Sequence, residues 1–305
     1  MLKYLKNIEI DKLKWNACIS TCKHGLIYAE FEYLNTMSEH WDALVMNDYE
    51  AVMPLTWKSK YGIKYLYQPA FIQQGGIFSI APISIDTINV FIDTASSHFK
   101  FAEIALHHAM PDDIKSFSVV LKNNYLLSLE SNYESLSGNY KPYIKERLQR
   151  LKKFKLEYKS TEDINKAVDI YRSTYGYRLS KVSVSHFEQF KSLCAFYALE
   201  KRVIVREVTD EVSKESLAIV VMLKDNNRIY NLASSVTAKG KKLLANYFLY
   251  DQIFREFSGK GLIFDFEGSD IPGVAYFYEK FADCNQQYPF LKWNKLPLLI
   301  RLLKR

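Results

Sequence analysis

The alternation of apolar and polar residues predicts a sheet with a few helices in the first half of the chain. Apolar runs on either side of Asn47-Asp48 predict a β-hairpin over 41–59. Residues 64–79 predict a further strand, interrupted by proline and bent by two glycines. The other elements expected in this half are helices at 11–20 and 83–97, a strand running into a helix at 26–35, and strands at 101–106, 117–121 and 125–130.

The second half carries the clearest helical pattern. Apolar residues recur at helical spacing over 239–257 and form a wide apolar face. A turn at 225–227 joins two strands that precede this helix. The two halves share an order of helices, hairpin, strand and helix, which suggests an internal duplication. The other elements expected here are helices at 143–154, 162–174 and 185–193 and strands at 195–208, 217–223 and 228–234.

The stretch 262–282, LIFDFEGSDIPGVAYFYEKFA, predicts a strand, a turn and a helix. Side chains alternate across a strand, so Asp265 and Glu267 point to the same face. Apolar residues then recur at helical spacing after a serine or aspartate N-cap. Two carboxylates at the end of a strand, followed by a capped helix, are typical of a polar site at a sheet edge. The commoner alternative is a strand end whose carboxylates cap loops or pair with Lys and Arg.

Composition describes a soluble globular protein. The chain has 305 residues, 48% hydrophobic and 25% charged, which is enough for one large or two ordinary domains. It has no apolar run near the length of about 18 residues that spans a bilayer, and its first residues do not resemble a signal peptide. Its four scattered cysteines suit a reducing compartment, so we expect a cytoplasmic protein.

The charge distribution changes near residue 140. Residues 1–140 contain 11 Lys, no Arg and 15 acidic residues, whereas residues 141–159 contain 8 basic and 2 acidic residues. We therefore expect two domains, at 1–140 and 141–305. The basic helix that opens the second domain could contact RNA phosphates or a membrane surface. A solvated linker helix is commoner, and no aromatic residues alternate with its charges as in RNA-binding surfaces.

The chain resembles the FemAB-like branch of the GNAT acyltransferase superfamily in three segments, WDALVMNDYEAVMPL, YLYQPAFIQQGGIF and LIFDFEGSDIPGVAYFYEKFA. The resemblance covers nearly the whole chain. It implies an α/β fold of two GNAT-like domains in tandem, each a mixed, mainly antiparallel sheet flanked by helices. Fem-type enzymes transfer an amino acid from aminoacyl-tRNA to an amine of a peptidoglycan precursor, and other GNAT proteins transfer an acyl group from acyl-CoA to an amine.

GNAT enzymes usually bind the coenzyme A pyrophosphate with a (Q/R)-x-x-G-x-(G/A) loop at the start of the long helix. The corresponding segment here, 234–242, keeps one glycine and adds lysines. Backbone N–H groups at a helix start and nearby cations can hold a phosphate. The resemblance therefore implies donor binding by Ser234, Ser235, Lys239, Gly240, Lys241 and Lys242.

Acyl transfer to an amine requires a base, a proton donor for the leaving group and positioning. Asp265 and Glu267 are the candidate bases, since a carboxylate near another carboxylate has a raised pKa. Tyr276 and Tyr278 cannot both serve as proton donor, because residues two apart on a helix face different ways. We select Tyr278, with packing as the alternative for either tyrosine.

Uncharged amides on the bent strand suit recognition of a peptide or sugar, with edge polar residues as the alternative. The residues expected to bind substrate are Trp41, Tyr67, Gln68, Gln73, Gln74 and Ser269. We expect no metal, because His107 and His108 point to opposite faces of a strand and Cys18 and Cys22 lack nearby partners.

The sequence thus predicts an N-acyltransferase that uses acyl-CoA or aminoacyl-tRNA as donor and an amine as acceptor, such as a cell-wall or peptide precursor. tRNA is a possible partner, and the apolar tail 298–305 could contact a membrane surface, although docking on its own domain is the safer interpretation. The alternative is a binding or scaffold protein that kept the fold and lost the chemistry. The incomplete phosphate loop favours this alternative, and the acidic pair disfavours it.

Overall fold

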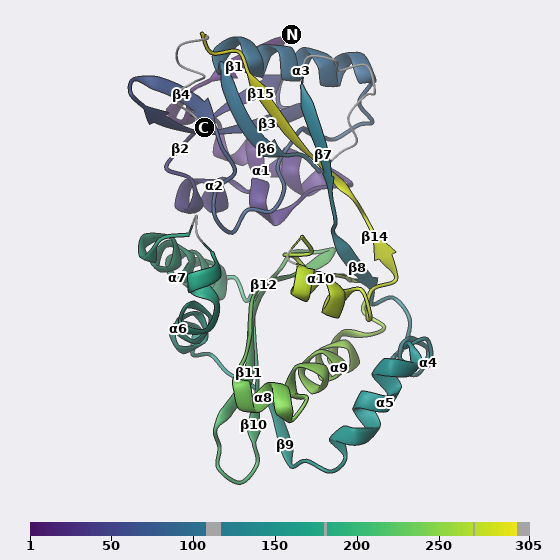
Figure 1. Cartoon of the computed structure of the whole chain (residues 1–305). Coiled ribbons are helices and arrows are strands. Elements are labelled where there is room, and N and C mark those ends of the chain that lie inside the picture. Colours follow the sequence, from purple (N-terminus) through teal and green to yellow (C-terminus); the bar gives the residue numbers. More distant parts are fainter. Residues whose placement is uncertain (108–116, 180–181, 271, 298–305) are drawn as a thin grey trace. The chain divides into compact units, whose positions relative to one another are not determined.

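The computed structural model describes residues 1–107, 117–179, 182–270 and 272–297. His108 and the tail 298–305 lie outside the described residues. The chain divides into two compact units (Figure 1). Unit 1 comprises Met1–Lys122 and Gln287–Arg305, and unit 2 comprises Asn123–Gln286.

The sheet of unit 1 combines strands from both ends of the chain. In order across the sheet these are β1 (Leu2–Leu5), β2 (His40–Met46), β3 (Ala51–Lys60), β4 (Ile63–Leu66), β6 (Phe101–Ala105), β15 (Tyr288–Asn294) and β7 (Ser118–Lys122), with β5 (Phe78–Ser79) paired to β3. The pair β4 and β6 is parallel, and the other pairs are antiparallel. The predicted hairpin over 41–59 is confirmed as β2 and β3, with Asn47 in a left-handed turn at φ 52°.

The helices of unit 1 are α1 (Lys12–Thr21), α2 (Phe31–Met37) and α3 (Ile85–His98), with short 3₁₀ helices at Asn7–Glu9 and Ile27–Ala29. The carboxylate of Asp11 caps α1 by accepting hydrogen bonds from the backbone N–H groups of the first turn. The strand expected at the start of 26–35 is wrong. Tyr33, Leu34 and Met37 are buried at helical spacing, so this segment packs as a helix. The strand expected over 64–79 is reduced to β4 and β5.

The sheet of unit 2 contains, in order, β14 (Cys284–Asn285), β8 (Tyr125–Ser128), β13 (Ile263–Asp265), β12 (Arg228–Val236), β11 (Ser216–Lys224), β10 (Val203–Asp210) and β9 (Leu156–Ser160). Its helices are α4 (Tyr133–Gly138), α5 (Pro142–Leu151), α6 (Ile164–Tyr175), α7 (Val184–Leu199), α8 (Ala238–Lys242), α9 (Ala245–Phe257) and α10 (Pro272–Tyr278), with a 3₁₀ helix at Gly176–Arg178. Helices α6 and α7 cover one face of this sheet, and α5 and α9 lie on the other (Figure 1). The pair β12 and β13 is parallel.

Two expected elements of unit 2 differ in the structure. The single helix over 239–257 is broken into α8 and α9, because Leu244 has left-handed backbone geometry with φ 58°. The strand expected from 195 begins at Val203, because α7 continues to Leu199. This longer helix buries Phe187, Phe190 and other apolar residues at helical spacing.

The two units repeat one order of elements. Unit 1 runs β1, α1 and α2, β2 to β4, α3 and β6, and unit 2 runs β9, α6 and α7, β10 to β12, α8 and α9, and β13. In each unit the last strand is parallel to the third strand of the meander. The two GNAT-like domains are therefore present. The turn at 47–48 joins β2 to β3, so its counterpart joins β10 to β11 and is not the turn at 225–227.

The chain passes from unit 1 to unit 2 and back again. β7 lies at the edge of the unit 1 sheet, and the chain continues directly into β8 of unit 2. β14 pairs with β8 in unit 2, and the chain returns through β15 to lie between β6 and β7 of unit 1. This division differs from the expected boundary at residue 140, because α4 and α5 bury Leu136, Tyr140 and Ile144 in the core of unit 2.

Candidate functional site

Asp265 ends β13 and is fully buried. Its Oδ2 atom lies 2.7 Å from the Arg228 guanidinium and accepts a hydrogen bond from Asn124 Nδ2 at 3.2 Å. Its Oδ1 atom accepts the backbone N–H of Glu267 at 3.1 Å. Both carboxylate oxygens are therefore engaged, and this residue anchors the end of the strand. One of the two carboxylates predicted as bases thus has a complete set of structural partners.

Glu267 is also buried, but among the described residues its carboxyl lacks the partners that Asp265 has. Its Oε1 atom is buried and has no hydrogen-bond partner among the described residues. Burial raises the pKa of this carboxyl well above its ordinary value of 4.5. The backbone at Glu267 is left-handed, with φ 54°, which is unfavourable for a residue other than glycine. A buried, unpaired carboxyl on a strained backbone destabilises a fold and is typical of a functional position.

A hydrogen-bonded network lies beside the end of β13. The Nδ2 atom of Asn231, on β12, lies 2.9 and 3.0 Å from the hydroxyls of Tyr250 and Tyr278 and 3.0 Å from the Phe266 carbonyl, so its two protons are shared among three acceptors. The Tyr250 hydroxyl donates to Ser234 Oγ at 3.0 Å and contacts the Tyr278 hydroxyl at 3.2 Å. A register shift between β11 and β12 lies opposite this position, so Asn231 and Ser234 reach the same tyrosine.

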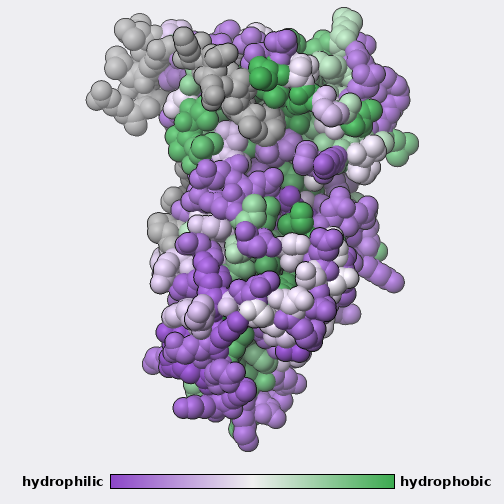
Figure 2. All heavy atoms as spheres, turned by 90° about the vertical axis from the view of Figure 1, so that its right-hand side faces the viewer, coloured by the Kyte–Doolittle hydropathy of each residue, from purple (hydrophilic) through white to green (hydrophobic). Residues whose placement is uncertain are grey.

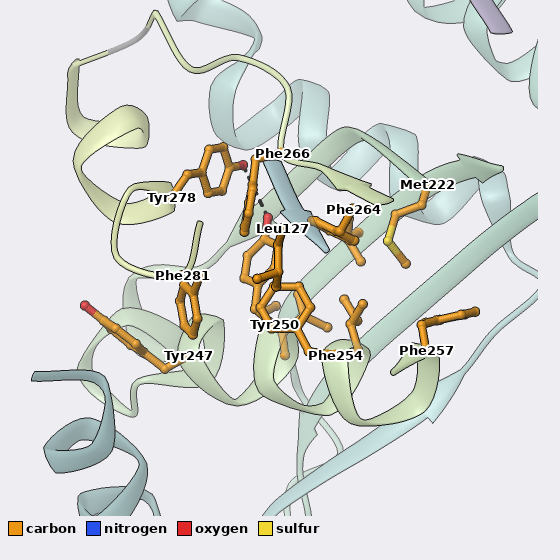
Figure 3. Close-up of a cluster of buried hydrophobic side chains, with 14 of the residues drawn as sticks. Leu127, Met222, Tyr247, Tyr250, Phe254, Phe257, Phe264, Phe266, Tyr278 and Phe281 are labelled. Atoms are coloured by element: carbon orange, nitrogen blue, oxygen red, sulfur yellow. Dashed lines mark hydrogen bonds between the residues drawn. The ribbon is translucent and has the colours of Figure 1, made fainter. Parts of the chain in front are cut away.

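The network is enclosed by aromatic rings. Figure 3 shows the hydroxyls of Tyr250 and Tyr278 pointing toward one another, with Phe266 and Phe281 nearby. Burial is the main cause that raises the pKa of both phenols, so both stay protonated at neutral pH. The Tyr278 hydroxyl accepts from Asn231 Nδ2 and forms a hydrogen bond with the Tyr250 hydroxyl, in which either phenol can be the donor.

The edge of β12 beside this network has no strand partner for much of its length. β13 pairs with β12 only from Arg228 to Tyr230, whereas β12 continues to Val236. Among the described residues, no other strand pairs with this edge beyond Tyr230. An unpaired strand edge presents N–H and C=O groups to an extended ligand. The unpaired edge begins after Tyr230, beside Asn231 and the end of β13. The two phenols and the buried Glu267 therefore lie next to the start of this edge, where one end of a bound ligand would lie.

In the expected phosphate loop at α8, the glycine is required by packing. A Cβ atom on Gly240 would lie 2.1 Å from the Leu217 carbonyl oxygen, so only glycine fits against β11. Thr237 caps the helix by accepting the N–H of Gly240. Lys239 Nζ lies 2.7 Å from Glu215 and 3.3 Å from Asp210, which neutralise its charge.

The other residues of this loop are less constrained. Lys241 lies 5.7 Å from the ring centre of Tyr175, and Lys242 is exposed. The Ser235 hydroxyl is buried without a hydrogen-bond partner among the described residues. Ser234 belongs to the tyrosine network. The structure therefore brings Ser234 and Tyr278 together through Tyr250, and places Lys239 and Gly240 in structural roles.

Five of the six expected substrate-binding residues lie in unit 1. Gln68 and Gln74 line one pocket with Thr56, and none of the described side chains that line this pocket is charged. Gln68 accepts the Ala105 N–H at 2.8 Å and donates to the Ile72 carbonyl at 2.7 Å, so its amide fills the gap where β4 and β6 part.

The remaining expected residues make structural contacts. Gln73 accepts a hydrogen bond from Gln74 at 2.6 Å. Trp41 is buried, and its indole N–H donates to Asn35. The Tyr67 hydroxyl accepts the backbone N–H of Glu39. Ser269, in unit 2, is buried and accepts the backbone N–H of Tyr125, which holds the turn after Glu267 against β8.

Sequence reasoning missed Asn231, Tyr250 and Arg228. Tyr250 falls on the apolar face that the sequence predicts over 239–257, where a phenol cannot be told from a packing ring. Asn231 carried a usable signal, since a lone amide between apolar strand residues must find buried partners. Within the described parts of the chain, no three His, Cys, Asp or Glu side chains are grouped to hold a metal ion. Nor does any helix there have both the length and the apolar character needed to cross a bilayer.

No protein-family model matches the sequence, and no curated protein matches it. Solved structures do match its fold. FemX superimposes with a TM-score of 0.67 at 10% identity, over 99% of this chain and 100% of FemX. A tandem GNAT protein from the clavulanic acid biosynthesis pathway has a TM-score of 0.54 at 8% identity, over 97% and 99% of the two chains. L-PGS from Bacillus licheniformis has a TM-score of 0.52 at 11% identity, over 96% and 95%. The chain therefore has the fold of FemX and of the tandem GNAT protein, as the resemblance of its motifs predicted.

Proposed function

We propose that this chain transfers an acyl or aminoacyl group from acyl-CoA or aminoacyl-tRNA to an amine. The fold shared with FemX and with a tandem GNAT protein supports this class of reaction. The single observation that carries the proposal is the buried carboxyl of Glu267, which lacks a partner among the described residues beside the tyrosine network. A structural carboxylate at this position would have partners like those of Asp265.

The proposed reaction assigns one role to each group. The donor lies along the unpaired edge of β12 as an extended chain. Glu267, as the carboxylate, takes a proton from the ammonium of the acceptor, and its raised pKa makes it an effective base. The free amine attacks the donor carbonyl, so a C–N bond forms and the C–S or C–O bond to the leaving group breaks.

Tyr278 is the proposed proton donor in the second half of the reaction. Its proton passes to the thiolate or alkoxide that leaves, and the nitrogen of the intermediate then gives its extra proton to the phenolate, which restores Tyr278. Asn231 and Tyr250 orient the phenol through their hydrogen bonds. Burial keeps the phenol protonated before this step. Asp265 positions the backbone of Glu267 and does not take part in the proton transfers.

The test is acyl transfer by the full chain to a panel of amines, with acetyl-CoA and with charged tRNA as donors. We expect transfer from one of these donors, and we expect Glu267→Gln to abolish it while binding of the donor persists. A control variant is Glu130→Gln, which removes an exposed carboxylate of the same unit. No product with either donor would refute the proposal and favour a binding or scaffold role.

A further inference from the structure

A cluster of cations and tyrosines lies between α5 and α10, outside the proposed catalytic residues. It consists of Tyr143 and Arg147 from α5 and of Tyr276 and Lys280 from α10 and the turn after it. We call these four residues the α5–α10 cluster. Lys280 Nζ lies 3.6 Å from the ring centre of Tyr276 and 4.2 Å from that of Tyr143. The Arg147 guanidinium lies 4.6 Å from the same Tyr143 ring.

The cations of the α5–α10 cluster have no counter-charge. Among the described residues, neither Arg147 nor Lys280 forms an ion pair, although Glu146 and Glu279 are their neighbours in the sequence. The Arg147 Nε atom is buried and has no hydrogen-bond partner within the described parts of the chain. A hydrogen bond with Tyr247 and the two cations lower the pKa of Tyr143. This surface therefore favours an anion.

The contrast with α8 is informative, because the resemblance implied phosphate binding there. Lys239 is held by Glu215 and Asp210, so a phosphate would have to compete with two carboxylates. Among the described residues, no carboxylate forms an ion pair with Arg147 or Lys280 that a phosphate would have to displace. The ring of Tyr276 beside Lys280 is 65% exposed.

The α5–α10 cluster and the proposed catalytic network share helices. Helix α10 carries Tyr276 of the cluster and Tyr278 of the network, which face different ways because they are two residues apart. The hydroxyl of Tyr143 lies 3.3 Å from that of Tyr247, which is on α9 with Tyr250. A ligand held at the cluster would thus contact the helix that also carries Tyr278.

We propose that the α5–α10 cluster binds the phosphate-bearing adenosine of the acyl donor. This inference rests on the proposed function and names where that donor is held. Coenzyme A ends in a phosphorylated adenosine, and tRNA ends in an adenosine joined through phosphate, so both donors share this chemistry. Arg147 and Lys280 hold the phosphate, and the base stacks on the exposed ring of Tyr276, in the manner of sites for single-stranded nucleic acids.

A lipid surface fits this region less well. Figure 2 shows the side of unit 2 that carries α4, α5 and β14, and hydrophilic residues dominate it. A helix that lies on a membrane surface exposes an apolar face, which enters the lipid, and carries its basic residues on the opposite face. In α5, by contrast, the apolar residues Ile144 and Leu151 are buried in the core of unit 2.

The test measures binding of adenosine 3′,5′-bisphosphate and of the trinucleotide CCA to the full chain by calorimetry. We expect Tyr276→Ala, and separately Arg147→Gln with Lys280→Gln, to weaken binding about tenfold or more. The matched control, Lys152→Gln with Lys153→Gln, removes two exposed charges beyond the end of α5 and should change binding less than twofold. Thermal unfolding of each variant confirms that it folds.

Equal affinity of the wild type and the cluster variants would overturn the inference, as would loss of binding only in a Lys239→Gln variant with Lys241→Gln and Lys242→Gln. Absence of binding to both probes would overturn it as well. Preference for the bisphosphate or for CCA identifies the donor as coenzyme A or tRNA. Nucleotide binding at the cluster without acyl transfer would refute the proposed function alone. Transfer with an unchanged donor KM in the cluster variants would refute this inference alone.

Discussion

Replacing Asp265 by Asn separates structural from catalytic roles at the end of β13. The substitution keeps the size of the side chain and an oxygen for the Glu267 N–H, but it removes the charge that faces Arg228 at 2.7 Å. The Arg228 side chain is 14% exposed, so water cannot replace the lost partner. We therefore expect a large loss of stability.

The magnitude follows from the burial of the pair. Removing one partner of a buried ion pair costs about 3–5 kcal/mol, because the other charge stays buried and unpaired. In a domain of the size of unit 2, each kcal/mol lowers the Tm by about 2–4 °C. The Tm should thus fall by about 10 °C. A second variant, Arg228→Met with Asp265→Leu, should recover most of this loss, because no unpaired charge remains.

The assay combines thermal unfolding with acyl transfer measured well below the Tm of the variant. We expect Asp265→Asn to lower the Tm strongly and to keep a substantial part of the activity of the folded protein. A Tm shift below about 2 °C with loss of activity would refute the reasoning, because it would make Asp265 a catalytic group. Recovery of stability in the double variant is the independent check on the ion pair.

Three further outcomes follow from the site. Burial raises the pKa of Glu267 in the folded chain, so the free energy of unfolding should fall as the pH rises from the ordinary pKa of 4.5 toward the pKa in the folded chain. Denaturant unfolding measures this pH dependence, and Glu267→Gln should remove it and abolish transfer. Tyr278→Phe should lower kcat about 100-fold or more with little change in donor affinity or Tm, and an equal kcat would exclude it as proton donor. Gly240→Ala should destabilise the chain by about 2 kcal/mol or more, because its Cβ would lie 2.1 Å from the Leu217 oxygen, and an unchanged free energy of unfolding would contradict this packing.

The elements with strong periodicity were predictable, including the hairpin β2–β3 and the strand that ends at Asp265. The tandem domains came from the resemblance of motifs. The break at Leu244 could not be predicted, because the apolar pattern continues through this residue while its backbone is left-handed. The roles of the two carboxylates could not be separated either. The sequence places both on the same face of one predicted strand, whereas the observed strand ends at Asp265, and the contacts of Arg228 and Asn124 with Asp265 distinguish the two.

The α5–α10 cluster shows a further limit of the sequence. Tyr276 follows α5 by more than 120 residues, so the basic helix alone lacks the ring that makes it a candidate nucleotide site. The network of Asn231, Tyr250 and Tyr278 is likewise assembled from β12, α9 and α10. Composition and local spacing describe each contributor, but only the fold brings them to one place.

The return of the chain from unit 2 to complete the sheet of unit 1 has a consequence for biosynthesis. β6 and β7 belong to the unit that is translated first, but the strand between them, β15, is the last that the ribosome delivers among the described elements. Unit 2 can therefore complete its sheet earlier than unit 1, the reverse of the usual order in which the N-terminal domain folds first. Until residues 288–294 emerge, the facing edges of β6 and β7 are unpaired, and such edges favour aggregation. Stalled or prematurely terminated chains should depend on chaperones for this reason.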